Sequence, residues 1–237
     1  IDEHGFLHFT NLAGFSATCL PASMVVVKGV RTLPGVVATL PPHLISEEEQ
    51  KKPLPLSKLV IDIGYSAEEA RKLVRVGDPI VLRQSCVNLL GSRVSGKALD
   101  NRAGIAVLLD ALNTLRKMPL PVELYVAFSA GEEFSGFGAR QAAEALAPDE
   151  AIVVDVTHGE SAGTPKEKAF PLGSGAAIGI APVLSGEVTG QLLALAKQHR
   201  VPHVKEAMSG KTGTNSDAIA SSRNGVAVGL VSIPLRY

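Results

Sequence analysis

The chain has 237 residues, of which 46% are hydrophobic, and it carries 23 basic and 23 acidic side chains. This length is enough for a sizeable core in one or two domains. Because the net charge is zero, nothing in the composition attracts nucleic acid or an anionic membrane, and no run of about 18 apolar residues predicts a membrane span. We therefore expect a globular protein that binds neither nucleic acid nor membrane.

The first part of the chain, residues 1–94, has the pattern of a β-rich domain. Its short apolar runs alternate with turns that contain Gly, Pro or Asp, as in a set of short strands. These runs lie at 22–28, 35–40, 59–63 and 79–83. Ser66 is a candidate N-cap for a helix at 67–73, and the charged run at 46–52 is expected to be a loop. Several short strands at this spacing predict a small β-barrel.

The two cysteines, Cys19 and Cys86, lie far apart in the sequence and among apolar residues. Free thiols in such surroundings are usually buried, and they persist in a reducing compartment. We therefore expect two buried free thiols rather than a disulfide, and a cytoplasmic protein.

The second part, residues 95–237, alternates strand and helix patterns. Apolar runs at 122–129 and 151–154 resemble buried parallel strands, and 137–146 between them has the pattern of a crossover helix. Further along, a helix is predicted at 188–199 and strands at 201–206 and 225–234. This order predicts an α/β domain.

Acidic residues occur at three points in this second part: Asp100, the pair Glu132 and Glu133, and Asp155. Each point follows an apolar run and adjoins a turn, and in open α/β sheets such strand ends collect ligands. Carboxylates brought together there would repel one another unless cations neutralised them. Two divalent metals about 3.5–4 Å apart, with a nearby Glu as general base, suit hydrolysis by an activated water. Each residue alone has a plainer explanation, such as an N-cap or a turn; together they indicate a two-metal site.

The segments around these residues resemble the successive motifs of the M42 family of metallo-aminopeptidases, the tetrahedral-shell (TET) peptidases. The motifs are ALDNRAG, SAGEEFSGFGA and VVDVTHG. Outside the site, IDEHGFLHF, GVVATLPPHL, LVIDIGYSAEEARKLVRVGDPIV and GVAVGLVSIPLRY also resemble the family pattern, in its order. The resemblance therefore covers essentially the whole chain.

The resemblance implies a three-layer α/β/α catalytic domain of the zinc-exopeptidase type over 95–237 and a small β-barrel accessory domain over 1–94. It implies that Asp100 bridges two metal ions, zinc or cobalt, and that Glu133 and Asp155 each bind one of them. Glu132 would be the general base. The resemblance also implies a cis peptide bond after Asp100.

The sequence departs from the family at Asn101, where the family often has Asp. A neutral amide there weakens the case for a role of that position. The family's two metal-binding histidines would lie before the segment that matches Ile1 and after the one that matches Tyr237. We therefore expect the sequence to be a piece of a longer protein that lacks both.

The turn at 212–218 resembles a family turn on the substrate side of the pocket, so Thr214 and Asp217 are candidate substrate-binding residues. An equally simple explanation is that both cap the following helix. The function expected by resemblance is release of N-terminal residues from short peptides by subunits that form dimers and then a tetrahedral dodecamer. Two alternatives stay open: another two-metal amidohydrolase, such as a deacylase, and a non-catalytic assembly subunit. The preferred N-terminal residue and the metal are left open.

Overall fold

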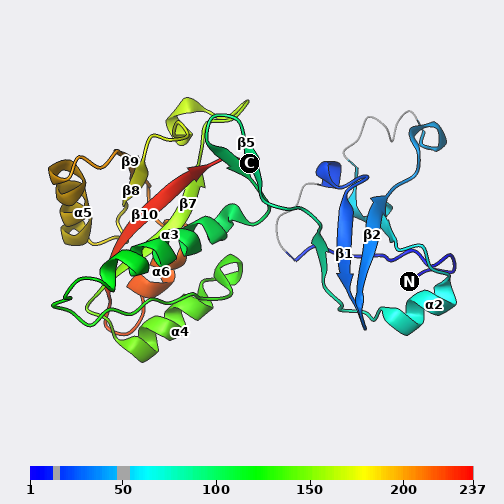
Figure 1. Ribbon diagram of the computed structural model, residues 1–237, viewed down its shortest axis with the longest axis horizontal. Coiled ribbons are helices and arrows are strands. Elements are labelled where there is room, and N and C mark those ends of the chain that lie inside the picture. Colours follow the sequence, from blue (N-terminus) through cyan, green and yellow to red (C-terminus); the bar gives the residue numbers. More distant parts are fainter. Residues whose placement is uncertain (13–16, 47–53, 237) are drawn as a thin grey trace. The chain divides into compact units, whose positions relative to one another are not determined.

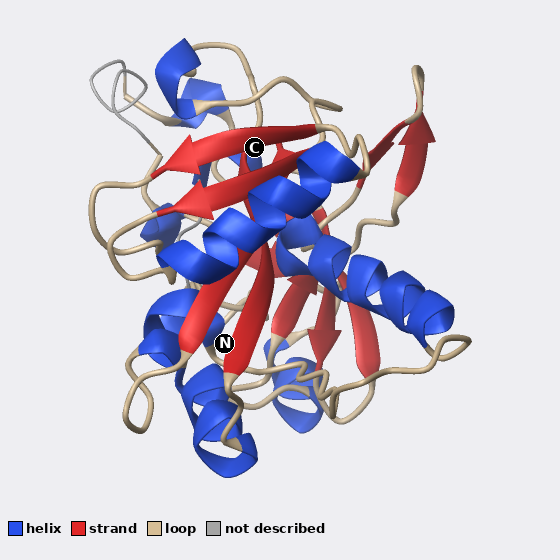
Figure 2. Cartoon of the chain, turned by 90° about the vertical axis from the view of Figure 1, so that its left-hand side faces the viewer, coloured by secondary structure: helices blue, strands red, loops and turns tan. Residues whose placement is uncertain are grey.

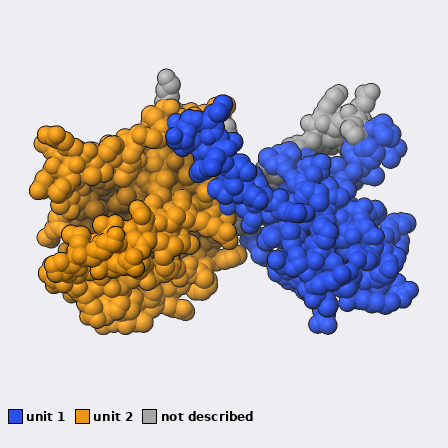
Figure 3. All heavy atoms as spheres, in the orientation of Figure 1, with its two compact units in different colours: residues 1–97 blue, residues 98–237 orange. Residues whose placement is uncertain are grey.

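The computed structural model describes residues 1–12, 17–46 and 54–236. The chain forms two compact units, Ile1–Lys97 and Ala98–Tyr237, which are coloured separately in Figure 3. Figure 1 labels their helices and strands. Each unit has its own hydrophobic core.

The first unit is built on a four-stranded antiparallel sheet with the strand order β3-β2-β1-β4. These strands are β1 (Met24–Lys28), β2 (Thr32–Ala38), β3 (Val60–Asp62) and β4 (Ile80–Leu82). A separate hairpin joins β5 (Val87–Leu89) to β6 (Arg93–Ser95). Side chains alternate between the two faces of a strand, so Val25 and Val27 of β1 both enter the core. The four strands predicted for the sheet are confirmed; β1, β3 and β4 are shorter than predicted, and β2 begins and ends earlier than the predicted 35–40.

The closed barrel predicted for this region is not found among the described residues. β3 and β4 are the outer strands of the sheet and do not pair with each other within these residues. Beyond β3 there is an isolated bridge between Leu7 and Ile61. A barrel needs its outer strands to share hydrogen bonds, so these strands form an open sheet.

The helix α2 (Ala67–Leu73) has the bounds that the sequence predicts. It begins there because Ser66 and Glu69 form a capping box. The Ser66 hydroxyl accepts a hydrogen bond from the Glu69 backbone N–H, and the Glu69 carboxylate accepts one from the Ser66 N–H at 3.2 Å. Two backbone donors of the first turn are thereby satisfied.

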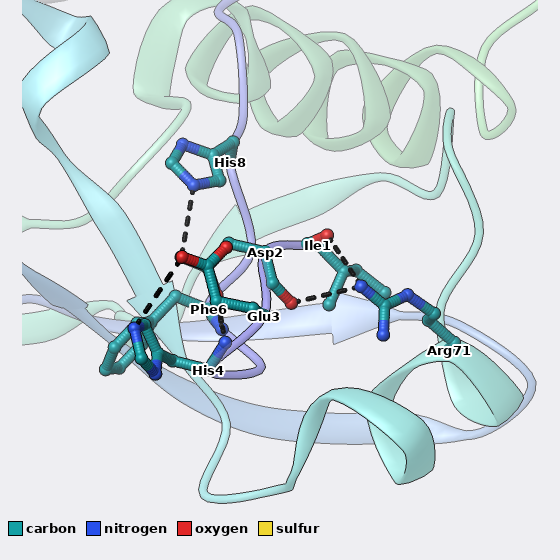
Figure 4. Close-up of polar contacts among 7 residues, drawn as sticks. All are labelled: Ile1, Asp2, Glu3, His4, Phe6, His8 and Arg71. Atoms are coloured by element: carbon teal, nitrogen blue, oxygen red, sulfur yellow. Dashed lines mark hydrogen bonds and ion pairs between the residues drawn. The ribbon is translucent and has the colours of Figure 1, made fainter.

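The N-terminal turn is attached to α2 through Arg71, as Figure 4 shows. The Arg71 guanidinium donates to the carbonyl oxygens of Ile1 and Asp2, at 3.3 and 3.2 Å. The Asp2 carboxylate accepts from the backbone N–H groups of His4 and Phe6, at 3.0 and 2.9 Å. This turn is therefore fixed by polar contacts.

The prediction made for the two cysteines is only partly confirmed. Cys19 and Cys86 are free thiols as predicted, but both are exposed rather than buried. Apolar neighbours in sequence did not place either side chain in a core, because neither lies on the inner face of the sheet. The loop predicted at 46–52 falls, from residue 47 on, outside the described residues.

The second unit contains a four-stranded mixed sheet with the order β7-β10-β8-β9. Its strands are β7 (Glu150–His158), β8 (Ala176–Ile180), β9 (His203–Ala207) and β10 (Ala227–Leu235). β10 runs parallel to β7, with Ser232 opposite Asp155, and antiparallel to β8. Its inner position explains the burial of Val228 and Leu230, which are at most 1% exposed.

Helices pack around this sheet (Figures 1 and 2). They are α3 (Leu99–Leu115), α4 (Phe137–Leu146), α5 (Gly186–Gln198) and α6 (Asn215–Ala220). Gly229 faces α5, since a Cβ there would lie 2.7 Å from Val188 and 2.9 Å from Leu192. Side chains alternate along a strand, so Leu230 and Ser232 point to the opposite face. α3 packs against β7, and α4 against α6. Of the helices within the described residues, none is long and apolar enough to cross a membrane.

The strand predicted at 122–129, next to 151–154, is wrong. β7 pairs with β10 instead, and no strand of the described residues shares hydrogen bonds with 122–129. Several apolar side chains of this segment are exposed: Val122, Leu124, Tyr125 and Phe128. The apolar run was recognised correctly, but a strand also needs a neighbour that takes its backbone hydrogen bonds.

A matched pair of substitutions tests the core of the first unit. Val27 of β1 is fully buried and Val81 of β4 is 39% exposed. We expect Val27→Ala to lower the free energy of unfolding by about 2 kcal/mol, because it removes buried methyl groups and leaves a cavity. Val81→Ala should change it by less than about 0.5 kcal/mol. Urea denaturation followed by circular dichroism measures both, and equal effects would contradict the assigned core.

Candidate active site

A pocket in the second unit brings together the four acidic residues identified in the sequence. Asp100, Glu132, Glu133 and Asp155 all line it, and its volume is about 670 Å³. Hydroxyl groups make up much of the remaining polar lining, from Thr157, Ser161, Thr164, Thr212, Thr214 and Ser232. Residues from five separate segments of the second unit therefore meet at one site.

Asp155 is held in the sheet itself. It lies on β7 opposite Ser232 of β10 and is only 6% exposed. One of its carboxylate oxygens accepts a hydrogen bond from the Val156 backbone N–H at 2.9 Å. A carboxylate this deeply buried is costly to keep charged without a partner, so its presence calls for a cation or a proton.

Asp100 enters the pocket from the start of α3. Its backbone is not helical, with φ −79° and ψ 110°, and Ala98 occupies the N-cap position. The simple explanation of Asp100 as the helix N-cap is therefore wrong. The peptide bond between Asp100 and Asn101 is cis, as the resemblance implies.

Glu132 and Glu133 form a single 3-10 turn, Glu132–Phe134, that follows Gly131. Gly131 has φ +78°, and a Cβ there would lie 2.0 Å from the ring of Phe137. Only glycine fits this turn. The tight turn carries both glutamates to the pocket, directly after the apolar segment 122–129.

Burial and neighbouring charges raise the pKa of two of these carboxyls. Burial is the largest cause for Asp155; together with the charges of Asp100 and Glu133, and against a lowering by the hydrogen bond from Val156, it raises the pKa to about 6. Burial also raises the pKa of Glu132, with added contributions from Asp155, Glu133 and Asp100. No lysine or arginine is found among the described residues that line the pocket. The pocket therefore concentrates carboxylates with no lysine or arginine in this lining, although His158 also lines it.

Divalent metals are the cations that such a donor set fits best, since carboxylate oxygens bind zinc, magnesium and related ions. Within the described ranges, however, no three His, Cys, Asp or Glu side chains are grouped so that they could hold a metal ion. The charge and the donor chemistry of the pocket thus fit metal ions, whereas the side chains lie apart rather than around one point.

The two candidate substrate-binding residues differ in position. Thr214 lines the pocket and also caps α6, since its hydroxyl accepts from the Ser216 N–H at 3.1 Å. Asp217 does not line the pocket. Its carboxylate accepts from the backbone N–H groups of Thr212 and Gly213, at 2.9 and 3.1 Å, and so closes the turn before α6.

Sequence reasoning missed Glu206, a fifth carboxylate in the pocket lining. It lies on β9, and its Oε1 accepts a hydrogen bond from the Thr157 hydroxyl of β7. Its Oε2 is buried and has no hydrogen-bond partner among the residues that the structure describes. Nothing in the run HVKEA distinguishes this glutamate from an ordinary strand residue, because only the strand order of the sheet brings it to the site.

Comparison with known proteins gives a consistent result. The model of the M42 glutamyl aminopeptidase family matches residues 1–237. The lysyl aminopeptidase of Pyrococcus furiosus is 30% identical over 244 residues, which cover 100% of this chain and 69% of that protein.

Solved structures agree. A TET aminopeptidase from a marine sediment thaumarchaeon superposes with a TM-score of 0.91 at 29% identity, covering 100% of this chain and 69% of that one. The TET1 peptidase of Pyrococcus horikoshii, which assembles into a tetrahedron or a large octahedral shell, gives 0.84 at 28% identity, covering 100% and 71%.

The second unit thus has the mixed α/β architecture of TET aminopeptidases, with the acidic motifs in one pocket. The family match extends over every residue of the sequence. Its members are metal-dependent aminopeptidases, hydrolases that act on peptide bonds. This chain belongs to the M42 peptidase family.

Proposed function

We propose that this chain acts as a metal-dependent aminopeptidase that removes N-terminal residues from short peptides. The observation that carries the proposal is the pocket in which Asp100, Glu132, Glu133 and Asp155 meet, with no lysine or arginine among the described residues that line it. In a family of metal-dependent peptidases, such a pocket is best explained as the place where metal ions and the peptide bond meet.

Three of these carboxylates would hold the metals. Asp100 would serve both of two divalent ions, zinc or cobalt, while Glu133 would bind one and Asp155 the other. When bound, such ions make a water molecule acidic and polarise the scissile carbonyl group. The raised pKa of Asp155 supports this role, since a cation would relieve the repulsion that its neighbours exert on it.

Glu132 is proposed as the general base. It lies next to Glu133 in the same turn, so it reaches the same space. Burial and its acidic neighbours raise its pKa above the ordinary value of a glutamate. A base with a pKa nearer the working pH can both accept the proton of the attacking water and return it to the leaving amine.

The two parts of the chain would then divide the work. Residues 95–237 would form the catalytic domain, of the three-layer zinc-exopeptidase type, and residues 1–94 a small β-rich accessory domain that supports assembly. Self-association through dimers into a tetrahedral dodecamer is supported by the TET relatives, one of which is solved as a dodecamer. Two free thiols agree with the cytoplasm as its location.

Substitution of the proposed base tests the catalytic role. We expect Glu132→Gln to lower kcat for leucyl-, lysyl- and glutamyl-p-nitroanilide by about 10²- to 10⁴-fold, because the amide cannot take a proton. The affinity for Zn²⁺ or Co²⁺ should change by less than about threefold, since Glu132 binds no metal. Steady-state kinetics with added metal, together with calorimetric metal titration, measure both quantities.

The control is Glu187→Gln, the same chemical change in the first turn of α5, on the opposite face of the sheet. It should leave kcat unchanged. If Glu132→Gln retained full activity, Glu132 could not be the general base. Metal-dependent cleavage of N-acyl amino acids, with none of the anilides, would favour a deacylase.

The pKa of Asp155 predicts how stability depends on pH in the metal-free protein. A carboxyl whose pKa is raised in the folded state stabilises the fold at pH below its ordinary value of 3.8, and this contribution is lost as pH rises through about 6. Between these limits the folded state holds a proton that the unfolded state has released. We expect the loss to be on the order of 1 to 2 kcal/mol, since solvent screening reduces the full effect.

Urea denaturation in EDTA, at several pH values from 4 to 7, measures this loss against Asp155→Asn, which cannot ionise. The stability difference between the two proteins should shift against the wild type as pH rises. A difference that stays constant over this range would show that Asp155 ionises normally.

The proposed assembly predicts a particle mass of twelve subunits. Multi-angle light scattering and negative-stain microscopy measure the mass and the shape. A stable monomer or dimer at micromolar concentration would contradict the dodecamer while leaving the chemistry of the pocket untouched.

A further inference from the structure

Asn101 uses both ends of its side-chain amide within the second unit. Its Nδ2 donates to the backbone carbonyl of Val154 on β7 at 2.8 Å. Its Oδ1 accepts from the backbone N–H of Gly104 at 3.1 Å. The contact with Val154 joins two segments that lie 53 residues apart in the sequence.

Each of these contacts has a separate effect. Asn101 itself is not helical, with φ −113° and ψ 39°, so the regular part of α3 begins after it. By accepting from the N–H three residues on, its side chain does for this part of the helix what an N-cap does. By donating to Val154, the same amide attaches the start of the helix to β7.

The hydrogen bond between Asn101 and Val154 lies close to the candidate active site. Asn101 directly follows Asp100, and Val154 directly precedes Asp155. The hydrogen bond therefore lies one residue away from each of two pocket carboxylates, which come from different elements of the fold. The contact thus joins the two backbone segments that carry Asp100 and Asp155.

Gly104 supplies independent support. It is buried, and a Cβ there would lie 2.3 Å from the Asn101 Oδ1 and 3.0 Å from the Val154 carbonyl oxygen. The absence of a side chain at 104 thus leaves room for the amide and the carbonyl to meet. Asn101 and Gly104 therefore both contribute to the contact between the start of α3 and β7, which we call the α3–β7 junction.

The chemistry of the amide suits this place. An ionised carboxylate could accept from Gly104 but could not donate to a carbonyl oxygen. It would also add a further negative charge beside Asp100. The neutral amide makes both contacts without adding charge, so the expectation that Asn101 is unimportant because it lacks a charge is not supported by its contacts.

We propose that Asn101 is a positioning residue, whose side-chain amide fixes the separation of Asp100 and Asp155 and thereby sets how tightly they take up divalent metal. This inference rests on the proposed function, since it assumes that the two aspartates bind metal. Asn101 itself touches neither metal nor substrate. Its effect is transmitted through the backbone of α3 and β7.

The test compares variants of Asn101 and Gly104 by metal affinity. We expect Asn101→Ala to weaken Zn²⁺ and Co²⁺ binding about 10- to 100-fold, the range found when a group that orients metal ligands is removed. Gly104→Ala should weaken binding in the same direction, because its methyl group displaces the amide. Isothermal titration calorimetry on the purified protein measures affinity directly, and circular dichroism shows that each variant is folded.

If Asn101 and Gly104 act together at the contact between α3 and β7, their substitutions should have non-additive effects on metal affinity. Once Asn101 is truncated to Ala, the Gly104 methyl no longer meets the amide, so Gly104→Ala should cost less in the double variant than alone. Raising the metal concentration should restore the activity of Asn101→Ala, which a general loss of folding would not allow. Asn113→Ala, the same change on an exposed part of α3, should leave metal affinity within twofold of wild type.

Several outcomes would overturn the inference. Metal affinity of Asn101→Ala within twofold of wild type would do so, as would strictly additive losses or an activity loss that saturating metal does not restore. If the wild type takes up no divalent metal, the proposed function fails together with the inference. If the wild type binds metal and cleaves peptides while Asn101→Ala binds it equally well, only the inference fails.

Discussion

Repulsion between carboxylates that share one pocket is the constraint on which the rest of this structure depends. Asp155 is almost fully buried, and its neighbours Asp100 and Glu133 push its pKa in the same direction as burial does. Groups of like charge stay close together only when the rest of the fold holds them there. Such a cluster of carboxylates favours the binding of cations. The concentration of carboxylates in the pocket is therefore the feature on which its proposed function rests.

The fold holds these groups through contacts that have little to do with charge. The register of β10 on β7 places Ser232 beside Asp155. A glycine turn in which a Cβ would clash with Phe137 carries the two glutamates. α5 packs on the opposite face of the sheet, where Gly229 lets it approach. The helix α5 therefore supports the sheet from one side, while Ser232 and the pocket lie on the other.

Local sequence patterns predicted correctly those elements whose bounds depend on neighbouring residues alone. The capping box of Ser66 and Glu69 sets the start of α2, and α4 has the bounds that its apolar periodicity predicts. The acidic motifs were found because each adjoins a turn. Their meeting in one pocket depends on sheet order, which no local pattern encodes.

The errors have the same cause. Segment 122–129 has the composition of a strand, but a strand also requires a partner, and β7 pairs with β10. Glu206 was missed because it comes to the pocket only through the order of β8 and β9. Asn101 was undervalued because the role of an amide depends on the carbonyl opposite it, here that of Val154. Long-range pairing decides each of these cases.

The central claim is that the pocket carboxylates exist to bind metal ions in pairs. The most direct measurement is the number of Zn²⁺ or Co²⁺ ions bound per chain by the purified protein, determined by elemental analysis after dialysis and compared with Asp100→Asn. We predict two ions per chain in the wild type and loss of both in the variant, since Asp100 is proposed to serve both. No bound metal in the wild type, or two ions retained without Asp100, would contradict it.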